Sequence, residues 1–213
     1  MPPAKRTYTK EEIDSARFFL VRICTSGLEN PKELDEEFDY FNACPICKAD
    51  RIPKTNLHIP TNSMGKKMLD MNFRYGYLIF HENLVTLIKK QDIKGIDFID
   101  CSVGRERFLF KEGKISNVFP RQSDKSIVLI ENQCPKCFKS GHYDTYDVCS
   151  EFWHKRHDLD KLIDDFYLTW EYYSIWEKGA THPMLIVSKK CKDLVFDKIK
   201  QRHIKLEPIF EQD

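Results

Sequence analysis

Cys44-Pro45-Ile46-Cys47 and Cys134-Pro135-Lys136-Cys137 repeat one motif, 90 positions apart. Two residues between paired cysteines let both thiolates of one turn bind the same metal ion, and the proline stiffens that turn. A second pair completes a tetrahedron of sulfur ligands, which is the usual arrangement of a structural zinc site. The spacing therefore predicts one zinc ion per chain, bound by Cys44, Cys47, Cys134 and Cys137.

Three other interpretations of these cysteines stay open. A local zinc site could use Cys134, Cys137, His142 and Cys149. The Cys-Pro-x-Cys sequence also resembles the redox motif of glutaredoxins, but that chemistry requires a strand before the motif and a helix that begins inside it. Neither Asn42-Ala43 nor Pro53 suits that arrangement. The four cysteines could also carry no metal.

Composition and charge limit the class of protein. Of the 213 residues, 41% are apolar and 13% are aromatic, which is enough to bury a core. There are 34 Lys and Arg residues against 33 Asp and Glu residues, so the overall charge gives no reason to bind nucleic acid or anionic lipid. No apolar run reaches the roughly 18 residues of a membrane span, and the first residues do not resemble a signal peptide. We therefore expect a cytoplasmic protein with reduced cysteines and no membrane partner.

A strand–helix–strand pattern follows each Cys-Pro-x-Cys motif. The first pattern has strands at 77–80 and 96–101 and a helix through Leu84, Leu87 and Ile88. The second has strands at 184–187 and 204–209 and a helix that Ser188 caps. The sequence thus predicts an α+β fold of two pseudo-repeated halves, 44–125 and 126–213, joined by the shared zinc site into one compact unit. Residues 1–43 are predicted to form a separate N-terminal helical segment.

Three further patterns predict secondary structure outside these units. Thr9-Lys10-Glu11-Glu12 is typical of a capping box, and apolar residues at helical spacing extend that predicted helix to Gly27. The aromatic-rich stretch 150–176 also has helical spacing. Glu112-Gly113 lies between two apolar runs and indicates a hairpin turn.

No catalytic motif is present in the sequence. The nucleophile elbow, the phosphate-binding glycine loop and the His-Glu-x-x-His motif are all absent. A zinc ion with four thiolate ligands has no open position for water, so the predicted site is structural. The cluster His154-Lys155-Arg156-His157-Asp158 is interpreted as a solvated helix face. We therefore expect no enzymatic activity.

The motifs and the C-terminal run resemble the double-CXXCG motif proteins, immunity proteins of bacterial polymorphic toxin systems. The resemblance covers most of residues 44–210, and its most specific part is Pro183-Met184-Leu185-Ile186-Val187-Ser188 with Leu206-Glu207-Pro208-Ile209. Asp165-Phe166-Tyr167 and Trp170-Glu171 fit the aromatic segment that precedes it. Lys48 and Phe138 replace the glycine of the family motif, and His81-Glu82 replaces the serine region in the first unit.

This resemblance implies a non-enzymatic protein that binds and neutralises a cognate toxin. The alternative is a zinc-ribbon-like nucleic-acid-binding or adaptor protein. Residues 158–177 contain six acids and one lysine among Tyr and Trp residues, which suits a basic protein partner better than phosphate. We therefore expect a partner-binding face that includes Asp158, Asp164, Asp165 and Glu171.

Overall fold

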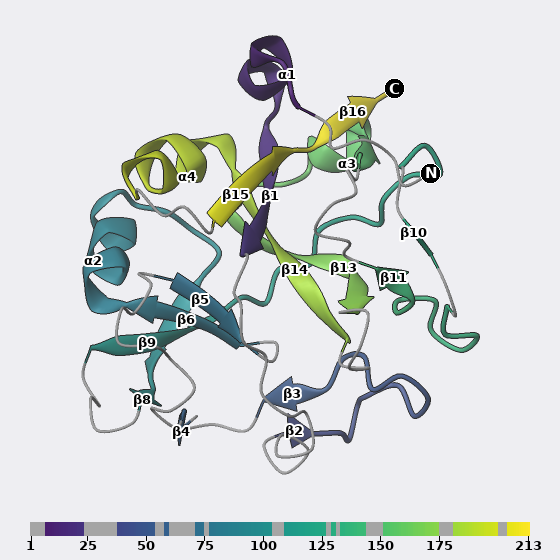
Figure 1. Ribbon diagram of the computed structural model, residues 1–213, viewed down its shortest axis with the longest axis horizontal. Coiled ribbons are helices and arrows are strands. Elements are labelled where there is room, and N and C mark those ends of the chain that lie inside the picture. The colour runs from purple at the N-terminus through teal and green to yellow at the C-terminus, as the bar shows by residue number, and fades with distance from the viewer. Residues whose placement is uncertain are drawn as a thin grey trace.

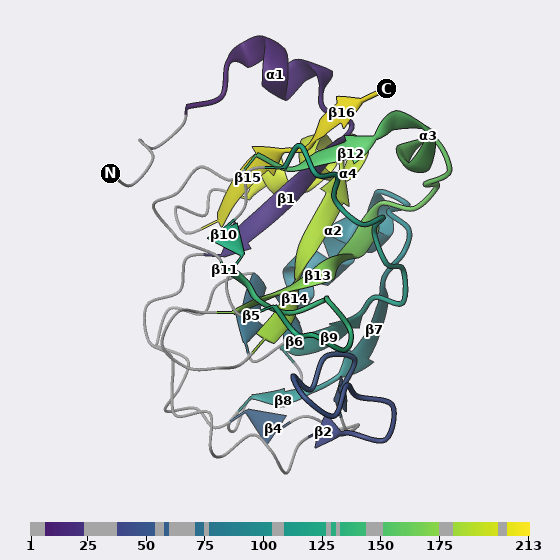
Figure 2. The ribbon, with the colours of Figure 1, turned by 90° about the vertical axis from the view of Figure 1, so that its right-hand side faces the viewer.

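The computed structural model describes residues 7–23, 38–53, 58–59, 71–74, 77–103, 109–126, 129–130, 133–143, 151–174, 181–199 and 204–213. The described residues form a mixed α+β fold with two main sheets and few helices, as the sequence predicted. In Figure 1 and Figure 2, α1 (Lys10–Ser15) and the C-terminus lie at one end, and the short strands β2 (Phe38–Asp39), β4 (His58–Ile59) and β8 (Ser102–Val103) lie at the other.

The larger sheet has six strands and draws on residues from both ends of the chain. Its order is β10-β11-β13-β14-β1-β15. The strands are β10 (Leu129–Ile130), β11 (His142–Tyr143), β13 (Phe166–Ser174), β14 (Thr181–Ser188), β1 (Phe18–Ile23) and β15 (Ile204–Pro208). Because β1 lies between β14 and β15, the N-terminal segment is a central part of this sheet.

The smaller main sheet has four strands in the order β5-β6-β9-β7. They are β5 (Met71–Arg74), β6 (Tyr77–His81), β9 (Phe110–Lys114) and β7 (Asp97–Asp100). Three two-stranded pairs complete the described strands: β12 (Trp153–Lys155) with β16 (Phe210–Gln212), β2 with β3 (Ile52–Pro53), and β4 with β8.

Each predicted strand–helix–strand unit is present, and in each unit another strand lies between the two outer strands. In the first unit α2 (Glu82–Lys90) connects β6 to β7, and both strands pair antiparallel with β9. In the second unit α4 (Lys189–Leu194) and a 3₁₀ turn (Phe196–Lys198) connect β14 to β15, and both strands pair antiparallel with β1. The outer strands of each unit are therefore parallel to each other.

Both connecting helices begin at a side-chain cap. The Ser188 hydroxyl accepts a hydrogen bond from the Cys191 N–H at 3.0 Å, as predicted. In the first unit His81 takes this place, and its Nδ1 accepts from the Asn83 N–H at 3.2 Å. The His81 ring satisfies one of the four N–H groups that a helix start leaves unpaired, so the departure from serine does not prevent capping.

The N-terminal helix ends much earlier than the periodicity predicted. The Thr9 capping box is confirmed, but α1 ends at Ser15 and Phe18–Ile23 is strand β1. Phe18 and Leu20 pack in one apolar cluster, while Phe19 and Val21 pack in another on the opposite face of the strand. A strand buried on both faces is apolar at every position, so its pattern does not separate it from a buried helix. The three-segment division of the chain stays a prediction.

The predicted helix over 150–176 is wrong. The described part of this stretch contains β12, a single turn of helix α3 (Arg156–Leu159) and the long strand β13. Strand β13 has a register shift between Leu168 and Tyr172, and it too is buried on both faces, with Phe166 and Tyr167 in different clusters. The bulge breaks the period of two, so the sequence resembled a helix.

The predicted hairpin at Glu112-Gly113 is also wrong, because β9 runs straight through both residues. A Cβ atom on Gly113 would collide with the rings and methyl groups of Phe80 and Ile96. This glycine therefore permits close packing within a strand and does not mark a turn.

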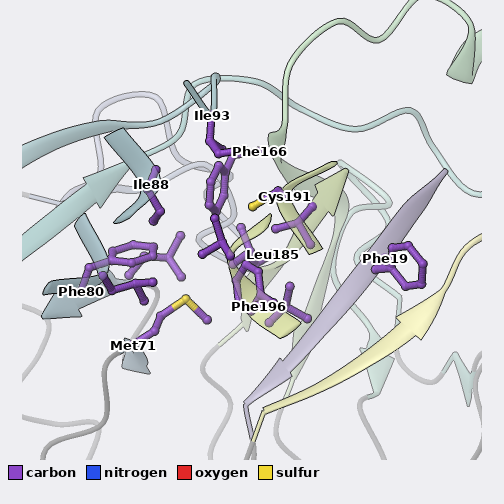
Figure 3. Packing of buried hydrophobic residues seen from close by; sticks show 14 of the residues in the cluster. Phe19, Met71, Phe80, Ile88, Ile93, Phe166, Leu185, Cys191 and Phe196 are labelled. Atoms are coloured by element: carbon purple, nitrogen blue, oxygen red, sulfur yellow. The ribbon is translucent and has the colours of Figure 1, made fainter. Parts of the chain in front are cut away.

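The two units share one apolar core between the sheets (Figure 3). Buried residues lie at equivalent positions: Leu78, Phe80, Leu84 and Ile88 in the first unit, and Leu185, Val187, Cys191 and Val195 in the second. The cap residue is His81 in the first unit and Ser188 in the second. Relative to the cap, the four residues of each set lie at positions −3, −1, +3 and +7. Met71 and Phe19 contribute to the same core from β5 and β1.

Among the described residues, no helix has the length and apolar character needed to cross a membrane.

Candidate metal centre

Each Cys-Pro-x-Cys motif forms a tight knuckle closed by backbone hydrogen bonds. In the first knuckle the Cys44 N–H donates to the Ala49 carbonyl at 2.8 Å, and the Lys48 N–H donates to the Cys44 carbonyl at 2.8 Å. In the second knuckle the Cys134 N–H donates to the Ser140 carbonyl at 3.3 Å, and the Phe138 N–H donates to the Cys134 carbonyl at 3.0 Å. The first knuckle is the end of a finger over 38–53, whose base is the β2–β3 pair.

The two knuckles bring their four sulfur atoms together. The Sγ atoms of Cys44 and Cys134 are 3.7 Å apart, those of Cys47 and Cys137 are 3.4 Å apart, and all four lie within 4.8 Å of one another. An ion bound by four thiolates at about 2.3 Å would separate neighbouring sulfurs by about 3.8 Å. The observed spacing matches that value and greatly exceeds the roughly 2.05 Å of a disulfide. The cluster could therefore hold one metal ion.

The pKa values of the four thiols are shifted in both directions: those of Cys44 and Cys134 are lowered, and those of Cys47 and Cys137 are raised. The backbone N–H groups of Cys47 and Ile46 lower the pKa of Cys44. Burial raises the pKa of Cys134, but the N–H groups of Cys137 and Lys136 outweigh this effect and lower it to about 6. Burial raises the pKa of Cys47, and burial with the neighbouring cysteines raises that of Cys137 to about 12. A bound divalent cation would favour the thiolate form of all four cysteines.

The residue after each knuckle has a left-handed backbone conformation. Lys48 has φ 60° and Phe138 has φ 58°. These are the positions at which the double-CXXCG family has glycine, and glycine is the residue that adopts such angles without a Cβ penalty. Lys48 and Phe138 therefore hold a glycine-type backbone conformation at a conformational cost.

We expect Lys48→Gly to raise the free energy of unfolding of the metal-loaded protein by up to about 1 kcal/mol, because it relieves this conformational cost. Chemical denaturation monitored by circular dichroism measures the change. Ile46→Gly is the matched control on the same knuckle, since Ile46 is exposed and has no left-handed angle. The control should lower stability, and an equal gain in both variants would contradict the explanation.

Tyr172 on β13 joins both knuckles, a role that its place in an aromatic-rich stretch did not reveal. Its N–H donates to the Lys139 carbonyl at 2.7 Å in the second knuckle. Its hydroxyl accepts from the Asp50 N–H and donates to the Asp50 carboxylate, both at 3.1 Å, in the first knuckle. The Lys139 ammonium completes the bridge with a 2.6 Å ion pair to Asp50. Tyr172 and Lys139 thus connect the two segments that carry the cysteines.

We expect Tyr172→Phe to weaken metal affinity about ten-fold, as loss of a group that orients metal ligands commonly does. Competition with a chromogenic chelator measures the affinity. Tyr167→Phe is the control, because the Tyr167 hydroxyl also accepts a backbone N–H, from Asp164 at 2.7 Å, but outside the cluster. Equal affinity loss in both variants would show that the effect is not specific to the metal centre.

The predicted acidic face does not form one exposed surface. Asp165 is buried and accepts hydrogen bonds from the Lys94 N–H at 2.9 Å and the Ser188 hydroxyl at 2.5 Å. Glu171 is buried and accepts from the Gln122 N–H at 2.8 Å, and burial raises its pKa. Both carboxylates accept hydrogen bonds from other segments of the chain, and they are too buried to contact a partner. Asp165 directly precedes β13 and Glu171 lies within it, and this strand is buried on both faces, whereas the prediction assumed a helix with one exposed face.

The other two acids of that set lie nearer the surface. Asp164 accepts a hydrogen bond from the Asn117 side chain at 2.9 Å, and Asp158 forms a 3.0 Å ion pair with Lys161. Both are half-buried. Partner binding by these two residues stays a prediction.

The predicted solvated face over 154–158 is wrong for His154 but holds for Lys155, Arg156 and His157, which are exposed. His154 is buried, its ring packs edge-on against Phe119, and burial lowers its pKa to about 4. The side chain of His142 and all of Cys149 lie outside the part of the chain that the structure describes. The local site over 134–149 is therefore not described, while the shared cluster is.

No family model matches this chain, and no curated protein matches it.

Proposed function

We propose that the cluster of Cys44, Cys47, Cys134 and Cys137 binds one structural Zn²⁺ per chain. Four thiolates at tetrahedral spacing are the donor set of structural zinc sites, and such a set leaves no position for a reacting water. We also propose that the two units are the pseudo-repeated halves expected from the sequence. Their matching split topology and equivalent core positions support this interpretation.

We infer that the protein is a non-enzymatic immunity protein, which binds and neutralises a cognate bacterial toxin in the cytoplasm. The observation that carries this proposal is the convergence of both Cys-Pro-x-Cys knuckles on one cluster. The resemblance to double-CXXCG immunity proteins rests on those two motifs, and the left-handed turn after each knuckle supports it. In this proposal the zinc ion holds a binding surface in place and takes no part in chemistry.

The surface most suited to a protein partner surrounds the knuckles. Among the exposed large apolar side chains, Phe41, Ile46 and Ile52 belong to the finger over 38–53, and Phe138 follows the second knuckle. Phe41 is 90% exposed and Ile46 is 59% exposed. Apolar side chains held outward on rigid turns are typical anchors of protein interfaces.

Co-expression with a candidate toxin gene from the same locus tests the proposal. We expect the double variant Phe41→Asp/Ile46→Asp to lose protection at least ten-fold, because it places two charges in an apolar interface. Leu109→Asp is the control: Leu109 is 43% exposed and lies outside both knuckles and outside residues 158–177. Protection should survive in the control, and zinc content should be unchanged in both. Full protection by the double variant would place the interface elsewhere, and absence of protection by the natural chain would reject the function.

One observation favours the alternative, a nucleic-acid-binding or adaptor protein. The Arg121 guanidinium lies 5.1 Å from the centre of the Trp170 ring, and the Lys139 ammonium lies 5.9 Å from the same ring, beside the second knuckle. Basic and aromatic side chains in alternation can bind single-stranded RNA or DNA. Tight, salt-sensitive binding to RNA with no protection against the toxin would favour this function.

A further inference from the structure

The four cysteines of the cluster differ in their access to solvent. Cys44 and Cys134 are 8% and 3% exposed, whereas Cys47 and Cys137 are half-buried. The two accessible cysteines are also in direct contact, with their Sγ atoms 3.4 Å apart. One belongs to the first knuckle and the other to the second, so an oxidant that enters from solvent meets a pair that spans both.

We propose that a peroxide oxidises Cys47 and Cys137 to a disulfide that links the two knuckles. One thiolate attacks a peroxide oxygen, which forms a sulfenic acid and releases hydroxide. The second thiolate then attacks the sulfenic sulfur, an S–S bond forms, the S–O bond breaks and a second hydroxide leaves. Two thiolates lose two electrons in total, and one hydrogen peroxide is reduced to two hydroxides.

This reaction would replace a metal crosslink by a covalent one. A site that has lost two of four thiolate ligands no longer has the donor set of structural zinc. The finger over 38–53 would stay attached to the second knuckle through the new disulfide. Oxidation would thus release the metal while the two halves stay connected. This inference depends on metal binding by the four-cysteine cluster and does not require toxin binding.

Peptide mapping of the zinc-loaded full chain after treatment with hydrogen peroxide tests the proposal. The sequence predicts that trypsin cuts after Lys48, Lys136 and Lys139, so Cys44 and Cys47 share one peptide, while Cys134 and Cys137 fall in different ones. We expect the tripeptide Cys137-Phe138-Lys139 to be disulfide-linked to the peptide that ends at Lys48, and fragmentation to place the bond at Cys47. A metal-sensitive dye should report release of the bound zinc.

Non-reducing electrophoresis adds a readout that does not depend on fragmentation. A bond between Cys47 and Cys137 closes a loop of 90 residues, so the oxidised chain should migrate faster than the reduced chain. Cys47→Ser should abolish the shift, and Cys101→Ser, which removes a buried cysteine outside the cluster, should retain it. Disulfides within one knuckle, Cys44 to Cys47 or Cys134 to Cys137, would overturn the proposal, as would unchanged thiols after peroxide treatment. If Cys47→Ser does not fold, the map of the natural chain decides alone.

Discussion

Cys44→Ser and Cys134→Ser should each remove the bound metal and lower the free energy of unfolding by at least about 3 kcal/mol. The two cysteines lie 90 positions apart, yet their sulfurs are 3.7 Å apart in one cluster. Each substitution therefore removes a ligand from the same ion and leaves three buried or half-buried thiols without it. Metal analysis of the purified variants and denaturant titration measure the two effects.

Cys191→Ser is the matched control for this pair of variants. Cys191 is buried on α4, in the core and away from the cluster, so the variant should keep its metal even if it loses some stability. The shared site requires the same metal loss in both cluster variants. If Cys44→Ser retained zinc and Cys134→Ser lost it, the local site with His142 and Cys149 would be correct and the shared site would be wrong.

Phe19→Ala should destabilise the protein by about 3–5 kcal/mol, which is a large part of the stability of most domains. Phe19 is 1% exposed near the start of β1 and lies opposite Val187 on β14 and Pro208 on β15. The Lys192 ammonium of α4 also lies 5.4 Å from the centre of its ring. Truncation would leave a cavity where the strand, the helix and the second sheet meet.

Phe41→Ala is the control for Phe19→Ala, since it is the same substitution at a side chain that is 90% exposed. Its stability should change by less than about 0.5 kcal/mol. Thermal unfolding of both variants, followed by circular dichroism, provides the comparison. A small effect at Phe19 would contradict the placement of β1 inside the six-stranded sheet.

The sequence predicted the parts of this fold whose signals are local. Turn chemistry and spacing located the Thr9 capping box, the Ser188 cap and both strand–helix–strand units. The four cysteines also came together as the motif spacing predicted. For the caps and the units a few neighbouring residues contain the physical reason for the structure, whereas the two distant cysteine pairs were expected to meet because a structural zinc ion needs four ligands.

Burial that the local sequence pattern does not reveal contributed to the wrong predictions for β1, β13 and the acidic face. Phe18-Phe19-Leu20-Val21 is apolar throughout because both sides of β1 lie in core clusters. The acids Asp165 and Glu171 seemed to belong to an exposed face because charged residues usually do. Their partners, Ser188, Lys94 and Gln122, come from segments distant in the sequence. Tertiary contacts determine whether such residues are buried, and the local sequence pattern does not indicate those contacts.

The position of β1 has a consequence for the order in which the chain folds during synthesis. Residues 18–23 leave the ribosome before their partner strands at 181–188 and 204–208, which follow about 170 residues later. At usual rates of translation that delay is roughly 10–30 s. The four-stranded sheet over 71–114 can form during this interval, whereas the apolar β1 segment has no native strand to pair with. The six-stranded sheet can therefore reach its native strand order only after residues 181–208 have been synthesised.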